Sequence, residues 1–144
     1  MRLLEVVKLR ISGIDHIAVA VKNIDDVLKL YRDVLGVELV KIEDVEEENV
    51  RIAMFRVGEA FIELLEPKTP DSVVTRFISE RGEGIHHIAL RVENIDEALK
   101  EVTSKGLRVI YRSSRNLKDR KINFIHPRDA HGVMIELIER LIEL

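Results

Sequence analysis

The chain has 144 residues, which is enough for one ordinary domain or two very small ones. Of these residues, 46% are hydrophobic and 34% are charged, so the chain has enough apolar side chains to form a core. The 23 basic and 26 acidic residues leave a net charge of −3, which argues against a dedicated nucleic-acid binder. There is no cysteine, so disulfides, thiol catalysis and cysteine-ligated metals are excluded.

The first half of the chain predicts a strand, a helix and three more strands. These strands are expected at 14–21, 37–45, 50–57 and 60–66. Asn23 or Asp25 can cap the helix, and Gly36 is well placed to end it. Apolar residues at helical spacing define one face of that helix: Ile24, Val27, Leu28, Tyr31 and Leu35.

The second half predicts the same order of elements after a short linking helix at 71–82. A strand is expected at 85–92, followed by a helix that Gly106 ends. The apolar face of this helix contains Ile95, Ala98, Leu99 and Val102. The three remaining strands are expected at 107–112, 121–126 and 132–139.

The two halves are copies of each other. Residues 16–29 and 87–100 are identical at nine of fourteen positions, and the segments 61–66 and 134–139 repeat in the same order at nearly the same offset. The sequence therefore predicts an α+β fold made of two tandem βαβββ modules.

Each copy carries one histidine and one glutamate on the strand face turned away from its helix, because side chains alternate along a strand. These residues are His16, Glu63, His87 and Glu136. If the modules face each other around a pseudo-twofold axis, the four side chains converge in one cleft. Two imidazoles and two carboxylates can hold Mn, Fe, Co, Ni or Zn and leave positions for a substrate with two adjacent oxygens. A structural role for each residue is the alternative.

The other histidines have different expected roles. His86 alternates to the opposite face from His87 and is left out of the metal site. His126 and His131 flank the segment 127–130, which contains proline and aspartate, so a role in the turn is favoured for both.

Three segments carry a resemblance to a known family. Residues 61–67, 81–89 and 124–137 (FIELLEP, RGEGIHHIA and FIHPRDAHGVMIEL) are similar to the methylmalonyl-CoA epimerase family of the vicinal oxygen chelate superfamily. The resemblance implies one vicinal-oxygen-chelate domain over 13–139 with a metal-binding cleft. Its parts are module one at 14–67, the linking helix at 71–82, module two at 85–139 and an N-terminal extension at 1–12.

This resemblance also implies a function. His16, Glu63, His87 and Glu136 take the metal positions, and Co, Mn, Ni or Zn is the expected ion. The implied reaction is the epimerisation of (2R)- and (2S)-methylmalonyl-CoA through a metal-stabilised enolate. Glu136 resembles the residue that is both a ligand and one acid/base.

The chain departs from the family at two places. Some relatives carry a second catalytic glutamate where this chain has Ile52, which leaves the second acid/base unassigned; Glu47 and Glu48 lie nearby, in an acidic run typical of a solvated surface. The glycine-containing segment common in the family is replaced by residues 117–120. Basic residues of this region could bind the phosphates of coenzyme A, with a solvated loop equally favoured: Arg115, Lys118, Arg120 and Lys121.

Three other functions use the same scaffold. They are a glyoxalase I-type lyase acting on a glutathione hemithioacetal, an extradiol-type dioxygenase with iron, and a non-catalytic protein that binds a small molecule. The expected partners are an acyl-CoA and a second copy of the chain, without nucleic acid or membrane. Residues 1–12 have no signal-peptide pattern and no apolar run approaches the ~20 residues that span a bilayer, so we expect a cytoplasmic protein.

Overall fold

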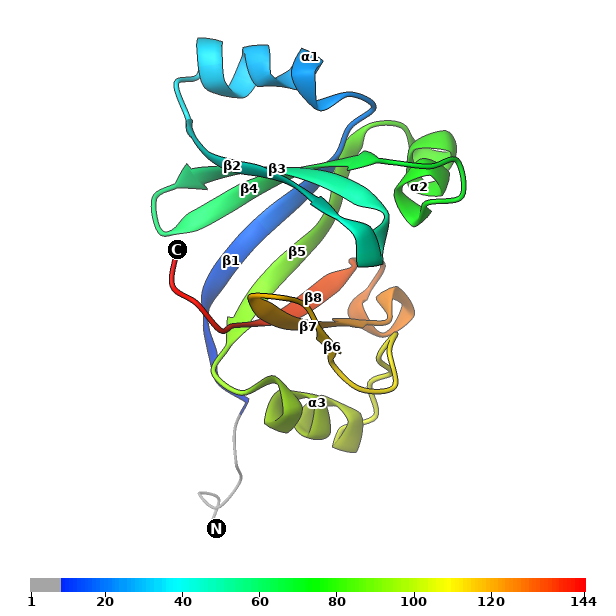
Figure 1. The fold of residues 1–144 in the computed structure, drawn as a ribbon. Coiled ribbons are helices and arrows are strands. Elements are labelled where there is room, and N and C mark those ends of the chain that lie inside the picture. Colours follow the sequence, from blue (N-terminus) through cyan, green and yellow to red (C-terminus); the bar gives the residue numbers. More distant parts are fainter. Residues whose placement is uncertain (1–8) are drawn as a thin grey trace. The chain divides into compact units, whose positions relative to one another are not determined.

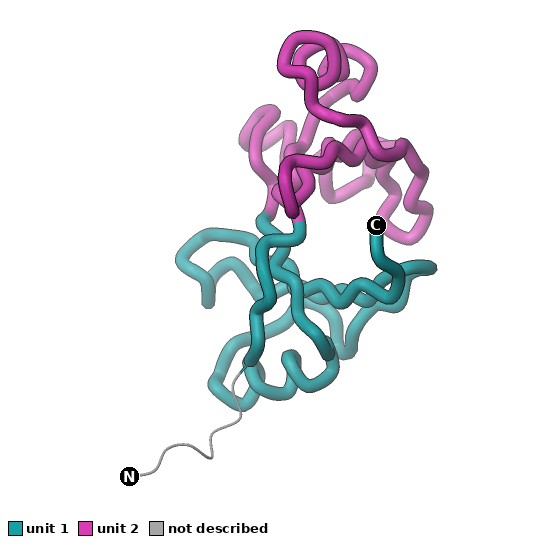
Figure 2. Tube along the Cα trace, turned by 90° about the vertical axis from the view of Figure 1, so that its left-hand side faces the viewer, with its two compact units in different colours: residues 1–15, 88–144 teal, residues 16–87 magenta. Residues whose placement is uncertain are grey.

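The computed structural model describes residues 9–144, which form two compact units. Unit 2 consists of residues 16–87, and unit 1 consists of the chain up to Asp15 together with residues 88–144 (Figure 2). Two strands, β1 (Ile11–Ala20) and β5 (Gly84–Val92), cross the boundary between the units. Each unit therefore receives part of both strands.

Unit 2 contains the first module (Figure 1). Its strands follow the order β2-β3-β4-β1, in which β1 is parallel to β4 and the other neighbours are antiparallel. The elements after β1 are α1 (Ile24–Leu28), a π-helical segment (Lys29–Val34), β2 (Glu38–Val45), β3 (Val50–Val57), β4 (Ala60–Pro67) and α2 (Val73–Arg81).

Unit 1 repeats this plan with the order β5-β8-β7-β6, in which β5 is parallel to β8. Its elements after β5 are α3 (Ile95–Ser104), β6 (Arg115–Asn116), β7 (Arg120–Ile125) and β8 (Ile135–Arg140). The predicted α+β fold with two βαβββ modules is confirmed. No helix in the described part of the chain is long and apolar enough to cross a membrane.

Each unit has an apolar core between its strands and one helix, α1 in unit 2 and α3 in unit 1. In unit 2 this core contains Val21, Ile24, Leu28, Ala53, Phe55 and Leu64. In unit 1 it contains Val92, Ile95, Ala98, Leu99, Val102, Ile125 and Leu137. The residues that align between the copies occupy the same places, which confirms the predicted helix-facing sides of the strands.

The first helix differs from its expected form. Tyr31 packs against the core as predicted, but Leu35 is 58% exposed. The backbone N–H of Leu35 donates to the carbonyl of Leu30, five residues earlier, at 2.9 Å. This wider π turn rotates the last residues away from the α-helical face, so the prediction for Leu35 was wrong. Gly36, at φ +68°, ends the helix as expected.

The predicted strand at 107–112 is also wrong. The structure has only an isolated bridge between Val109 and Ile125 there, and the short strand β6 follows at Arg115–Asn116. The fully buried side chain of Asn123 accepts a hydrogen bond from the N–H of Tyr111 at 3.0 Å and donates one to its carbonyl at 2.9 Å. A side chain thus replaces the backbone partner of a strand, which periodicity does not reveal.

The ends of the chain differ in extent from the prediction. The first strand begins at Ile11, so it takes in the last residues of the predicted extension at 1–12. Residues 1–8 of that extension lie outside the described residues. The last strand begins at Ile135, later than the expected 132. The predicted extent of a single domain, 13–139, stays a prediction.

The helices α1 and α3 are capped by the same two kinds of hydrogen bond. The side chains of Asn23 and Asn94 accept hydrogen bonds from the first turns of α1 and α3. In addition, Glu66 Oε1 accepts from the N–H of Ile24 at 2.8 Å, and Glu139 Oε1 accepts from the N–H of Ile95 at 2.9 Å. The second glutamate of the repeated segment therefore joins the last strand of each module to its helix.

We expect Glu66→Ala and Glu139→Ala each to lower the free energy of unfolding by about 1 kcal/mol, the usual cost of losing a helix cap. Urea unfolding followed by circular dichroism measures this change. Glu59→Ala, at an exposed turn position, is the matched control and should leave the free energy unchanged. An equal loss for Glu59→Ala would show that the effect is not capping.

A buried ion cluster stabilises unit 1. Asp15 is fully buried, and its Oδ1 accepts hydrogen bonds from Arg91 Nε at 3.0 Å and Nη2 at 2.6 Å. Its Oδ2 accepts from Arg140 Nη2 at 2.8 Å. One carboxylate on β1 thus joins strands β5 and β8 within this unit.

Candidate metal centre

The alternation of β1 and β4 gives unit 2 a polar face. Ala18 on β1 pairs in register with Glu63 on β4, so these two residues and His16 point to the same side of the sheet. His16 and Glu63 are only 2% and 6% exposed. The predicted orientation of both residues, away from the helix, is confirmed.

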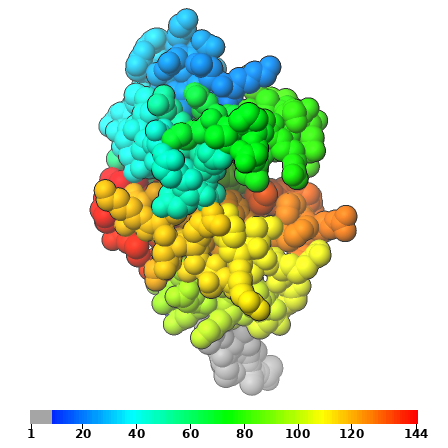
Figure 3. All heavy atoms as spheres, turned by 45° about the vertical axis from the view of Figure 1, so that its right-hand side comes forward, coloured from blue at the N-terminus to red at the C-terminus, as the bar shows by residue number. Residues whose placement is uncertain are grey.

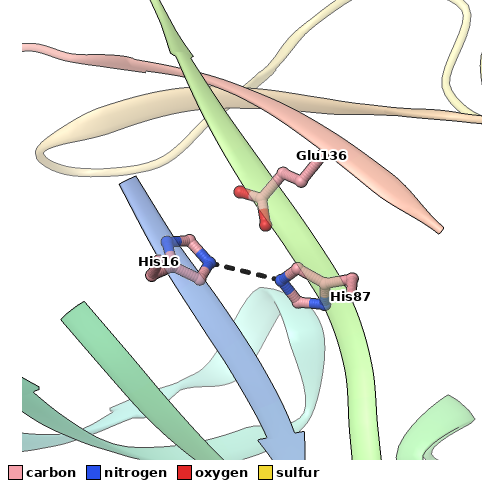
Figure 4. Close-up of side chains that lie close together, drawn as sticks. All are labelled: His16, His87 and Glu136. Carbon is pink, nitrogen blue, oxygen red and sulfur yellow. Dashed lines mark hydrogen bonds between the residues drawn. The ribbon is translucent and has the colours of Figure 1, made fainter. Parts of the chain in front are cut away.

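His16 contacts two other donor side chains on this face. His16 Nε2 lies 3.2 Å from His87 Nε2 and 3.5 Å from Glu63 Oε1. Figure 4 shows the contact between the two histidines, with the Nε2 atoms of the rings turned toward each other. His87 is 5% exposed, so all three side chains are buried. These residues are far apart in the sequence and lie on three different strands, β1, β4 and β5.

The spacing of these atoms fits the ligands of a divalent ion. Donor atoms about 2.1 Å from one ion lie about 3.0 Å apart at an angle of about 90° and about 3.4 Å apart at the tetrahedral angle. The separations of 3.2 and 3.5 Å at His16 are close to these values. Imidazole nitrogens and a carboxylate oxygen are also ligands that Mn, Co, Ni and Zn accept. Each of the two contacts of His16 thus has the spacing of neighbouring ligands of a divalent ion.

His86 contacts His87, a predicted metal ligand, at the ring nitrogen that does not face His16. Sequence reasoning missed this role. Its Nδ1 lies 2.8 Å from Nδ1 of His87, and its ring packs edge-on against Phe77 with centroids 4.9 Å apart. A hydrogen bond at the second nitrogen fixes which nitrogen of a metal-binding histidine is free to coordinate. The pair of adjacent histidines in the sequence is the signal that could have suggested it.

The carboxylate of the second module has the corresponding position in its own strand. In unit 1, Glu136 on β8 pairs in register with Ala89 on β5 and is 4% exposed. Ala89 follows His87 by two residues, as Ala18 follows His16. The local arrangement of Glu136, which Figure 4 also labels, thus repeats that of Glu63.

Ile52, at the expected place of a second catalytic glutamate, lies on β3 and is 6% exposed. Its register partner is Leu65, so it shares the face that carries Glu63. The nearby acidic run is a short 3-10 turn at Glu46–Glu48, in which Glu47 is exposed. A branched aliphatic side chain at Ile52 cannot carry a proton, so Ile52 cannot take the role expected of a glutamate at this position.

The basic region lies at the surface of unit 1, where Figure 3 colours residues 105–121 from yellow to orange. The guanidinium of Arg115 lies over the ring of Tyr111 at 4.0 Å, and Lys118 is exposed. Leu117, in the segment where glycine was expected, is buried at 8% exposure. The buried side chain of Leu117 therefore packs the segment 117–120 against the rest of unit 1.

The other two basic residues of the predicted phosphate site form ion pairs within the unit. Arg120 Nη1 lies 2.5 Å from Asp119 Oδ1, and Lys121 Nζ lies 4.0 Å from Asp96 Oδ2. The exposed partner Asp96 contributes little at that distance, so Lys121 can turn to an anionic ligand at small cost.

The turn before β8 has the predicted histidine chemistry. His126 caps the 3-10 helix Pro127–Ala130 by accepting from the N–H of Arg128 at 3.2 Å, and His131 has a left-handed backbone with φ +56°. Hydrogen bonds from the side chain and backbone of Arg108 lower the pKa of Asp129 to about 2. His126 thus caps the turn and His131 ends it, which agrees with the predicted place of both histidines in the turn.

Comparisons with known proteins find the family of this chain. Residues 15–124 match the model of the Glyoxalase/Bleomycin resistance protein/Dioxygenase superfamily. The mitochondrial methylmalonyl-CoA epimerase of Mus musculus is 30% identical over 130 residues, which cover 89% of this chain and 73% of that protein.

Two solved structures are similar along nearly their whole length. The methylmalonyl-CoA epimerase of Mycobacterium tuberculosis is 36% identical with a TM-score of 0.88, covering 94% of this chain and 92% of that one. A methylmalonyl-CoA epimerase in complex with methylmalonyl-CoA and NH4+ is also 36% identical, with a TM-score of 0.87, covering 91% and 96%.

Proposed function

Because the chain belongs to the Glyoxalase/Bleomycin resistance protein/Dioxygenase superfamily, with methylmalonyl-CoA epimerases among its relatives, we propose that it interconverts the two C2 epimers of methylmalonyl-CoA. The enzyme is an isomerase. The observation that carries the proposal is the contact of buried His16 with both His87 and Glu63. An acyl-CoA ligand is supported by the relative that holds methylmalonyl-CoA.

His16, Glu63 and His87 would hold a divalent ion, Co, Mn, Ni or Zn, with Glu136 as the fourth ligand. His16, His87 and Glu136 are all buried and each offers a ligand atom. When bound, the ion supplies positive charge beside the thioester oxygen, which gains negative charge as the C2 proton leaves. The matching register of Glu63 with Ala18 and of Glu136 with Ala89 supports this assignment.

Glu136 also serves as one acid/base of the reaction. Its carboxylate takes the C2 proton from one face of the substrate, and the electron pair of the broken bond moves toward the thioester carbonyl. Inversion at C2 then needs a proton from the opposite face. A single carboxylate would return the proton to the side from which it came.

The phosphates of coenzyme A would meet the basic side chains of unit 1. Arg115, Lys118 and Lys121 lie in the surface segment of residues 105–121 and on β7. Arg120 is held by Asp119 and so takes a smaller part. We also propose that the protein is a cytoplasmic homodimer.

The test is exchange of solvent deuterium into methylmalonyl-CoA, followed by mass spectrometry, with and without a metal chelator. We expect rapid exchange that the chelator stops and that added divalent metal restores. A glutathione hemithioacetal, the substrate of a glyoxalase I-type lyase, is the comparison. Turnover of the hemithioacetal alone would overturn the proposal, and so would exchange that is unaffected by complete metal removal.

A further inference from the structure

We propose that Glu43 on β2 is the second acid/base of the site, because its strand position puts it in register with Ile52 on the same sheet face as Glu63. This inference rests on the proposed epimerase function. It assigns a proton donor to the face of C2 opposite Glu136. Ile52 cannot be that donor, because its side chain carries no proton that it could give up.

The assignment rests on the register of three neighbouring strands, from β4 through β3 to β2. Glu63 on β4 lies opposite Met54 on β3, and Leu65 lies opposite Ile52. Ile52 in turn lies opposite Glu43 on β2. Directly paired residues in antiparallel strands point to the same side of the sheet, so Glu43 shares the face that presents Glu63.

The side chains between the two glutamates are apolar. Ile52, Met54 and Leu65 are 6%, 2% and 5% exposed, so they form a dry surface beside the metal centre. The β2 and β4 strands are separated by two strand spacings, about 10 Å. A small acyl group held at His16 and Glu63 would extend over this surface toward Glu43.

Lys41 positions the carboxylate of Glu43. Its Nζ lies 3.2 Å from Glu43 Oε1, and it stands opposite Met54 on the same face. The side chain of Glu43 is 35% exposed and that of Lys41 is 28% exposed, so both are accessible to solvent. Access to solvent lets the carboxyl group exchange its proton between turnovers.

The other acidic residues of this region are less suited to the role. Glu46 lies in the 3-10 turn beyond the end of β2 and pairs with Lys68 at 2.7 Å. Asp44 alternates to the opposite face of β2, where it pairs with Arg51 at 3.1 Å. Glu38 shares the face of Glu63 with Glu43, but it lies at the opposite end of β2, opposite Arg56, whose Nε is 3.8 Å from Glu38 Oε1.

The proton balance closes over one turnover. The C2–H bond breaks, its proton goes to the carboxylate of Glu136, and the electron pair enters the enolate. The carboxylic acid of Glu43 then forms the new C2–H bond on the other face and becomes a carboxylate. Glu136 loses its proton to water and Glu43 gains one, and the reverse reaction exchanges their roles.

The test separates deuterium exchange from inversion. In Glu43→Gln we expect inversion to fall about 100-fold or more, the usual effect of losing an acid/base. The epimer whose C2 proton faces Glu136 should still exchange deuterium with retention of configuration, because that side of the site is intact. Chiral analysis of the thioester after incubation in deuterated water measures both rates.

Asp44→Asn is the matched control on the opposite face of β2 and should keep both rates. Circular dichroism and bound-metal analysis verify that each variant is folded and loaded. Inversion at the wild-type rate in Glu43→Gln would overturn the assignment, and so would loss of exchange from both epimers in a folded, metal-loaded variant. Failure of the epimerase proposal would appear differently, as a wild-type protein with neither exchange nor inversion.

Discussion

His16→Ala should remove most of the bound divalent metal and reduce deuterium exchange about 1000-fold. His16 Nε2 lies 3.2 Å from His87 Nε2 and 3.5 Å from Glu63 Oε1, so it is the donor shared by both contacts. Loss of metal-derived charge stabilisation of about 4 kcal/mol corresponds to a rate change of about 1000-fold. Elemental analysis of the purified variant and the exchange assay measure the two effects.

The matched control is His131→Asn, which changes a histidine outside the metal centre. His131 has a left-handed backbone at φ +56°, a conformation that asparagine also adopts readily. We expect the control to keep its metal and its exchange rate. Full metal content in His16→Ala would contradict the assignment of the centre, whatever the activity of that variant.

The duplication explains why so much of the fold could be predicted. Helix faces and strand alternation depend on local spacing, and the second copy repeats each pattern independently. His16 and Glu63 follow from that alternation because β1 and β4 are neighbours in register. The repeat also made the glutamate pair more informative than either residue would be alone.

The features that sequence reasoning missed depend on contacts between side chains and backbone that have no period. Asn123 replaces a strand partner, which removes the predicted strand at 107–112. The π turn that exposes Leu35 changes the angle per residue rather than the hydrophobic pattern. Glu43 lies in an acidic run that suggests a solvated surface, and only the register with Ile52 brings it to the face of the site.

We expect the largest change in stability from removing the buried charge of Asp15. Asp15 directly precedes His16 in β1 and is fully buried between the guanidinium groups of Arg91 and Arg140. Arg140 has only 5% of its side chain exposed, whereas Arg91 keeps 32%. Removing the shared carboxylate leaves Arg140 with an uncompensated buried charge.

Asp15→Ala should therefore lower the free energy of unfolding by about 3–5 kcal/mol, the cost of breaking a buried ion pair from one side. Urea unfolding at neutral pH measures it, and Asp33→Ala, which breaks an exposed pair with Arg32, is the control and should leave the free energy of unfolding nearly unchanged. The double variant Asp15→Leu with Arg140→Met removes both charges and should recover much of the loss. If the double variant is as unstable as Asp15→Ala, the cost arises from lost packing around Asp15 and not from the charge left on Arg140.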